Sequence, residues 1–265
     1  MSVSRASLGL LALLAASLCV NAKGPAAAPK EQVLALDGSA TARRLVASLP
    51  DLEWPVMTPR FQFYRSPADP KDLGWLIDPE AMIVARVRLS GASLQRIRFW
   101  DFSAVAPPES VDDRVTRILH PVLYPVGRDR WAMAVLTSHS TMYSGGGASW
   151  TWATFHELMD LSASAKATEG ALELLHQAIP FGCSKSIRAC FSEKEYKTSG
   201  NCQESWNGIL RLRYGTPDRQ GAHPWTAIWE EMHVPGGTKK GKSTVARNTI
   251  NLDDPPETQC TEPMD

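Results

Sequence analysis

The sequence predicts an α+β fold in which antiparallel β-sheet predominates. Many short segments alternate apolar and polar residues, and turns rich in Gly, Pro, Asp and Ser separate them. Only two segments, about 39–49 and 166–179, have a helical pattern. Strands that follow one another across short turns favour antiparallel pairing, with the helices added at the margins.

The ends of the chain predict its division. An export signal over 1–22 and a flexible leader over 23–36 are expected before one globular domain, 37–252, and a C-terminal tail, 253–265. Arg5 precedes the apolar run LGLLALLAASLCV, and a small-x-small pattern predicts cleavage after Ala22.

The apolar run indicates the compartment. It is too short for a membrane span of about 20 residues. An uncleaved anchor and a lipoprotein modified at Cys19 are the alternatives. We therefore expect a periplasmic or secreted bacterial envelope protein, whose mature chain has no membrane span.

Strand candidates follow in order along the domain. They are 60–64, 81–89, 94–102, 117–124, 131–138, 150–159, 208–214, 225–234 and 244–252. The clearest pair is 81–89 with 94–102, because Ser90-Gly91-Ala92-Ser93 between them is a turn signal. The first helix is expected to end before Pro50. In the second helix, apolar residues from Ala171 to Ala178 recur at i, i+3, i+4 and i+7, and Pro180 ends it.

Two parts of the sequence resemble each other, around 131–159 and 206–233. A constant offset places Phe155 opposite Trp229 and Glu157 opposite Glu231. Two related halves of one sheet would explain the similarity, and chance resemblance between aromatic strands is the alternative.

Removal of the signal would leave four cysteines. An even number in an exported chain predicts two disulfides, whose pairing the sequence leaves open, although one must tie the tail to the 183–202 region. Zinc spacing is not matched, so no metal site is expected. These cysteines are Cys183, Cys190, Cys202 and Cys260.

Charge excludes some partners. The 28 Lys and Arg balance 28 Asp and Glu, so no general affinity for nucleic acid is expected. Residues 236–243, GGTKKGKS, match a phosphate-binding loop in form, but the alternating segment after them predicts a strand where that motif needs a helix. We therefore expect a basic hairpin loop and no cofactor.

Arginines give the most informative surface pattern. If residues 91–93 form a three-residue turn, Arg88 faces Arg96 and Arg86 faces Arg98 on one face of the hairpin. The pattern recurs on strand 208–214, where Arg211 and Arg213 alternate with apolar residues. These arginines either pair with carboxylates such as Glu157 or Glu231, or receive an acidic partner.

Tryptophan is the second candidate binding residue type. Trp150 and Trp152 lie on one side of their strand and Phe155 on the other, so one side is either buried or available for contact. Both tryptophans are included in the predicted binding surface with the arginines.

These patterns lead to a functional expectation with two alternatives. We expect a non-enzymatic domain of inhibitor or immunity type, which binds a protein partner in the envelope through its arginine-rich face. The first alternative is a periplasmic hydrolase with His139, His156 or Glu157 near a loop at 145–147. The second is a carbohydrate or small-ligand binder that uses exposed tryptophans.

Overall fold

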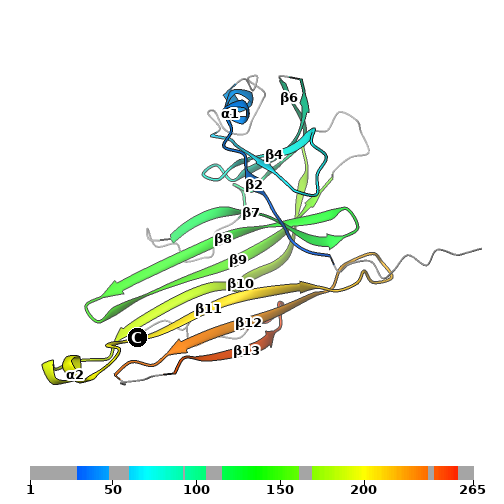
Figure 1. The fold of residues 1–265 in the computed structure, drawn as a ribbon. Coiled ribbons are helices and arrows are strands. Elements are labelled where there is room, and N and C mark those ends of the chain that lie inside the picture. The colour runs from blue at the N-terminus through cyan, green and yellow to red at the C-terminus, as the bar shows by residue number, and fades with distance from the viewer. Residues whose placement is uncertain are drawn as a thin grey trace, which may run out of the picture.

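Alternating apolar and polar residues build two antiparallel sheets and two short helices in the computed structural model (Figure 1). The structure describes residues 29–47, 60–91, 93–105, 115–160, 169–237 and 242–255. The predicted α+β architecture with antiparallel strands predominant is confirmed.

The smaller sheet has five strands and lies beside helix α1, Ala40–Ala47 (Figure 1). Its order is β2-β3-β4-β5-β6, with bounds Ala35–Leu36, Gln62–Arg65, Leu73–Asp78, Ile83–Ser90 and Ser93–Asp101. The helix lies within the predicted 39–49 segment, so that prediction is confirmed for the described residues.

The larger sheet has eight strands and curls along its length (Figure 1). Its order is β1-β7-β8-β9-β10-β11-β12-β13, with bounds Gln32–Val33, Val115–Gly127, Arg130–Tyr143, Gly146–Met159, Ala171–Arg188, Gln203–Tyr214, Trp225–Val234 and Thr244–Ile250. Helix α2, Glu193–Thr198, lies in the connection between β10 and β11.

Three apolar cores hold these layers together. Leu45 of α1 packs with Phe63 and Val87 on one face of the smaller sheet. The other face of that sheet packs against the larger sheet in a second core, which includes Trp75 and Met133. The third core fills the curl of the larger sheet. Strand β8 is buried on both faces as a result, because it contributes residues to the second and third cores.

The curl closes at one end because β7 meets the start of β12. The Nε1 of Trp225 donates to the Pro125 carbonyl oxygen at 2.8 Å, and the His223 amide donates to the Val126 carbonyl oxygen at 2.7 Å. The Tyr214 hydroxyl donates to Glu31 at 2.8 Å, which ties the N-terminal segment to β11.

Strand β10 corrects the predicted helix at 166–179. Ala178 has φ 53, which a right-handed helix excludes, and the register with β9 shifts three times between Leu174 and Gly182. A bulged strand loses strict alternation, so its apolar residues can imitate helical spacing. The unpaired backbone of β9 also gains a ladder partner along this segment, which favours the strand.

Two further predictions need correction. The leader expected at 23–36 contributes the short strands β1 and β2, because their backbones pair with β7 and β3. The turn expected at 91–93 is shorter, because Ser90 pairs directly with Ser93.

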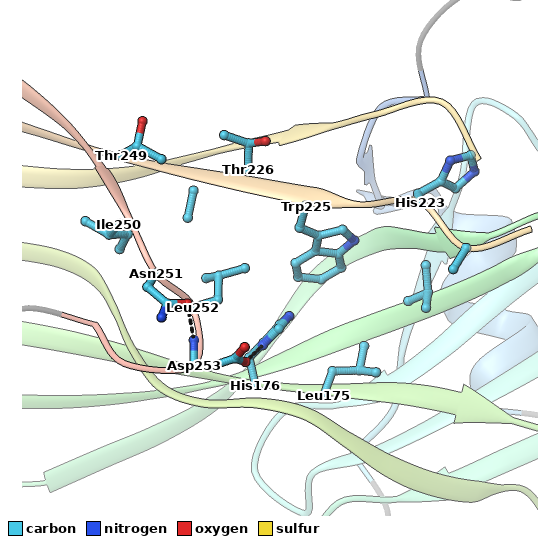
Figure 2. A pocket seen from close by; sticks show the side chains of 13 residues that line it. Leu175, His176, His223, Trp225, Thr226, Thr249, Ile250, Asn251, Leu252 and Asp253 are labelled. Atoms are coloured by element: carbon cyan, nitrogen blue, oxygen red, sulfur yellow. Dashed lines mark hydrogen bonds and ion pairs between the residues drawn. The ribbon is translucent and has the colours of Figure 1, made fainter. Parts of the chain in front are cut away.

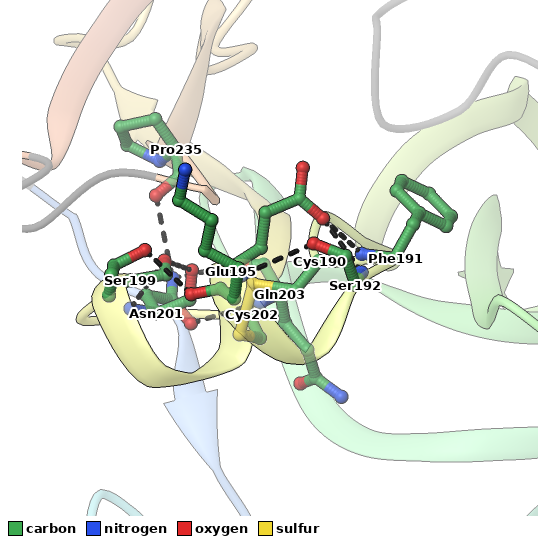
Figure 3. Close-up of a disulfide and its surroundings, with 11 residues drawn as sticks. Cys190, Phe191, Ser192, Glu195, Ser199, Asn201, Cys202, Gln203 and Pro235 are labelled. Carbon is green, nitrogen blue, oxygen red and sulfur yellow. Dashed lines mark hydrogen bonds between the residues drawn. A yellow bond between two sulfur atoms is a disulfide. The ribbon is translucent and has the colours of Figure 1, made fainter.

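One disulfide has both of its cysteines within the described residues. Cys190 and Cys202 form a disulfide across the base of the α2 connection (Figure 3). Cys183 is disulfide-bonded as well. Cys260 and the predicted signal over 1–22 lie outside the described residues.

Neither described helix is long and apolar enough to cross a bilayer. The two similar segments form β8–β9 and β11–β12, two hairpins of the larger sheet, and Phe155 and Trp229 share its core. A common origin for these hairpins stays a prediction.

Candidate ligand-binding cavity

A cavity of about 420 Å³ opens where β10 and β11 separate (Figure 2). The two strands pair only from Gly182 and Ile209 toward the α2 end. Toward the other end, β10 stays on β9, while β11 continues with β12. The cavity is lined by Val126, Leu175, His176, Ala222, His223, Trp225, Thr226, Ala227, Thr249, Ile250, Asn251, Leu252 and Asp253.

The irregular part of β10 positions one wall of this cavity. Leu175 and His176 lie at the first register shift, and a second shift follows before Ile179. Bulges redirect side chains that a regular ladder would point elsewhere, and they are common beside functional sites. Here they place Leu175 and His176 opposite Trp225 (Figure 2).

Trp225 forms the aromatic wall and is held on several sides. Its ring centroid lies 5.2 Å from that of Phe155, 5.5 Å from His176 and 5.6 Å from Tyr214. With its Nε1 bonded to the Pro125 carbonyl oxygen, the indole has little freedom to rotate. A fixed aromatic face can therefore meet a ligand at low entropic cost.

Two polar side chains of the lining, His176 and Asp253, lie close to each other. Asp253 Oδ1 is 3.5 Å from His176 Nδ1, and the Asp253 amide donates to Asn251 Oδ1 at 3.1 Å (Figure 2). Burial lowers the pKa of His176, although the Asp253 carboxylate partly opposes this shift. The imidazole is therefore mainly neutral at pH 7.

The charge balance of the lining restricts what the cavity can accept. Asp253 is the only acidic side chain among the thirteen described lining residues, which include no Lys or Arg. An anionic ligand would meet this carboxylate without a compensating Lys or Arg, but the repulsion is weakened by water because the Asp253 side chain is 84% exposed. Neutral or cationic ligands do not have this cost.

Behind Trp225 lies a buried set of hydroxyls. Tyr124 shares a hydrogen bond of 2.6 Å with His120 Nδ1, and Tyr214 donates to Glu31. Burial, reinforced by the Glu31 carboxylate, raises the pKa of both tyrosines. Both hydroxyls therefore stay protonated rather than act as bases, and that of Tyr214 is a hydrogen-bond donor to Glu31.

The predicted arginine face does not form as one surface. Arg86, Arg88, Arg96 and Arg98 lie on the smaller sheet, whereas Arg211 and Arg213 lie on β11 of the larger sheet. Arg86 lies opposite Arg98, as predicted. A register shift after this pair places Arg96 opposite Val87 and Arg88 opposite Gln95. The extra residue in β6 is the physical reason, since it rotates Arg96 out of the predicted alignment.

Most hairpin arginines have partners within the protein. Arg86 makes two hydrogen bonds to Asp69, at 2.5 and 2.7 Å, and its guanidinium lies over the Trp75 ring. Arg98 Nε lies 3.1 Å from Asp160 Oδ1. The pairing alternative is thus realised, but with other carboxylates than expected.

The remaining hairpin arginines are also engaged. Arg88 Nε is 3.6 Å from Asp72 Oδ2, and the Arg96 guanidinium lies over the Phe99 ring. Arg211 and Arg213 are exposed and alternate with the apolar residues of β11, as predicted.

Both candidate tryptophans lie away from the cavity. Trp150 is buried with 7% exposure, and its ring contacts those of His139 and Trp152. Trp152 is half-buried. Phe155 is fully buried in the core of the curl, so the strand has large aromatic residues on both sides, as predicted.

The groups of the hydrolase alternative are not brought together. His156 and Glu157 are neighbours on β9 and point to opposite faces, and Glu157 is paired with Arg130. The turn at Gly146 lies about 30 Å along the same strand from His156, at a rise of about 3.3 Å per residue. His139 lies near the turn and contacts Trp150.

The segment 236–243, which matches a phosphate-binding loop in form, is followed by a strand, as expected. Residues 238–241 lie outside the described residues, but β13 begins at Thr244 and pairs antiparallel with β12. A strand therefore follows where a phosphate-binding loop needs a helix. In the described ranges, no three His, Cys, Asp or Glu side chains are grouped to hold a metal ion.

Sequence reasoning did not identify the cavity. His176 lay in the predicted helix, and Asp253 lay in the predicted tail. Trp225 was expected only as the start of a strand. Comparison of the chain with protein-family models, curated proteins and solved structures gave no match.

Proposed function

We propose that the protein binds a small amphipathic molecule in the cavity between β10 and β12. The observation that carries this proposal is the fixed, half-buried ring of Trp225 in the wall of a cavity whose volume is within the range of small-ligand sites. A ligand with a planar apolar body and an amine or hydroxyl group fits this lining. The body would stack on Trp225, while its polar group would lie near Asp253.

The arginine-face hypothesis has less support, because the hairpin arginines have carboxylate or aromatic partners. The compartment proposed from the sequence agrees with the small-ligand proposal. The apolar run before Ala22 is typical of an export signal, and the Cys190–Cys202 disulfide favours an oxidising space. We therefore propose a ligand-binding protein of the bacterial envelope.

The first test uses three probes with one aromatic body. 2-Phenylethylamine and 2-phenylethanol should bind more tightly than phenylacetate, because only the last brings a negative charge beside Asp253. Isothermal titration calorimetry would measure the three dissociation constants. Tightest binding of phenylacetate would contradict the proposed ligand class.

Variants locate the binding event. Trp225→Ala should weaken 2-phenylethylamine binding at least about tenfold, since it removes the aromatic wall. Trp206→Ala is the matched control, because Trp206 is half-buried on β11 outside the cavity lining. Leu175→Trp keeps the indole of Trp225 but fills the cavity, and it should also abolish binding. Full binding by a folded Leu175→Trp variant would place the ligand elsewhere.

A further inference from the structure

One end of the larger sheet gathers segments that are far apart in sequence. We define the distal end as the β8–β9 turn, the last residues of β10, α2 and the start of β11 (Figure 1). The Arg188 amide donates to the Gly145 carbonyl oxygen at 2.6 Å, and the Tyr143 hydroxyl donates to the Ser186 carbonyl oxygen at 3.1 Å. These bonds hold the turn against β10.

Large apolar side chains are exposed at this end. Met142 is 88% exposed, Phe191 77% and Tyr196 52%, and Tyr143 is partly exposed. Single exposed apolar residues are ordinary, but here they come from two adjacent segments of one end. A concentration of this kind marks a surface that contacts an apolar phase.

The exposure of Phe191 is built into the local structure. Ser192 caps α2, and the Glu195 carboxylate accepts from the amides of both Phe191 and Ser192 at 2.8 Å (Figure 3). The Cys190–Cys202 disulfide closes the base of the same connection (Figure 3). Phe191 is therefore presented by a fixed backbone.

The acidic and basic side chains around these apolar groups differ in whether they have partners within the protein. Each glutamate described at this end has a partner within the protein: Glu193 with Lys197, Glu195 in the helix cap, and Glu204 with His233 at 2.7 Å. The basic groups Arg188, Lys194 and Lys242 are exposed. The distal end thus offers solvent-exposed cations beside aromatic and thioether side chains.

We propose that the distal end docks on the surface of an anionic lipid bilayer. Aromatic side chains and methionine can enter the interfacial region, while Lys and Arg remain at the level of the headgroups. The chemistry favours an anionic bilayer, because exposed cations lie beside the exposed aromatic and thioether side chains. This proposal is independent of the cavity and would stand if no ligand bound there.

Vesicle co-sedimentation tests this proposal. The chain from Lys23 onward, which keeps every described residue, would be mixed with phosphatidylcholine vesicles that contain or lack about one-third phosphatidylglycerol. Binding to the anionic vesicles, with at least about tenfold less binding to pure phosphatidylcholine, is expected. Equal binding to both, or binding to neither, would overturn the proposal; the second result would leave a protein partner for this end.

Matched variants separate the distal end from the rest of the surface. Met142→Ser with Phe191→Ser should reduce binding about tenfold or more, whereas Ile118→Ser with Val33→Ser, which changes exposed apolar residues on β7 and β1 away from this end, should not. Arg188→Glu with Lys194→Glu should also lose binding, and Arg211→Glu with Arg213→Glu should keep it. Thermal unfolding would confirm that each variant is folded. Binding as tight as that of the parent by the Met142/Phe191 variant or by the Arg188/Lys194 variant would contradict docking through this end.

Discussion

At the scale of single residues, the buried carboxylate of Glu157 shows how a polar side chain is accommodated in a core. The residue is 1% exposed, and Arg130 donates to both of its oxygens at 2.6 Å. The Glu157 hydrogen bonds raise the pKa of Arg130. The half-exposed guanidinium thus brings a positive charge to a carboxylate that water does not reach, as buried charges require.

Arg130→Ala should reduce the free energy of unfolding by about 3 kcal/mol, because it leaves a buried charge without its partner. Urea denaturation would measure the change. Arg60→Ala, which removes an exposed pair with Glu80, should cost less than about 1 kcal/mol. Replacing both members of the buried pair, with Arg130→Met and Glu157→Leu, should recover most of the loss. A similar cost for the buried and the exposed single variant would refute this account.

At the scale of secondary-structure elements, the strands that alternate regularly were predicted and the irregular strands were missed. The strand pair 81–89 and 94–102 was predicted because its residues alternate, and β5 and β6 occupy nearly the same ranges. Strand β10 was missed because its bulges remove the alternation on which such predictions depend. Strand β4 was missed because Trp75, Leu76 and Ile77 form a short buried run without period two.

The candidate site was harder to predict than the strands. Its cavity brings together His176 of β10, Trp225 of β12 and Asp253 after β13, and none of them belongs to a local motif. Their proximity depends on where β11 leaves β10, which is a property of sheet curvature. Residue patterns along one strand do not contain that information.

The α2 connection depends on its disulfide. Cys190→Ser with Cys202→Ser should lower the free energy of unfolding by about 3 kcal/mol, because it frees a loop of sequence separation 12 in the unfolded chain. Urea midpoints of the variant and the parent would give the difference. A reducing agent should lower the stability of the parent at least to that of the variant, because it opens the Cys183 disulfide as well. A variant as stable as the parent would show that the capping box alone holds the connection.

At the scale of the whole molecule, stability should depend on three histidines that are distributed through the larger sheet. Burial lowers the pKa of His120, His156 and His176 from the ordinary value of 6.5. The nearby Arg117 guanidinium lowers the pKa of His156 further. The unfolded chain therefore binds protons at these residues more readily than the folded protein.

The sign of the pH effect follows from this difference. The free energy of unfolding should be highest above pH 6.5 and fall as the pH drops below it, because protonation then favours the unfolded chain. Urea denaturation at pH 7.5 and pH 5 would measure the loss. His156→Phe, whose ring keeps the edge contact with Phe102, should reduce the slope with pH. A stability that rises toward pH 5 would contradict the burial effect.

The eighteen-residue strand β10 also limits how the gene can change in length. Adding a codon between Ser90 and Ser93 would only enlarge a hairpin turn. Deleting one between Gly182 and Ile187, where β10 pairs regularly with both β9 and β11, would turn every following side chain of the strand to the opposite face of the sheet. Insertions and deletions should accumulate at the turns of this protein and be purged from β10.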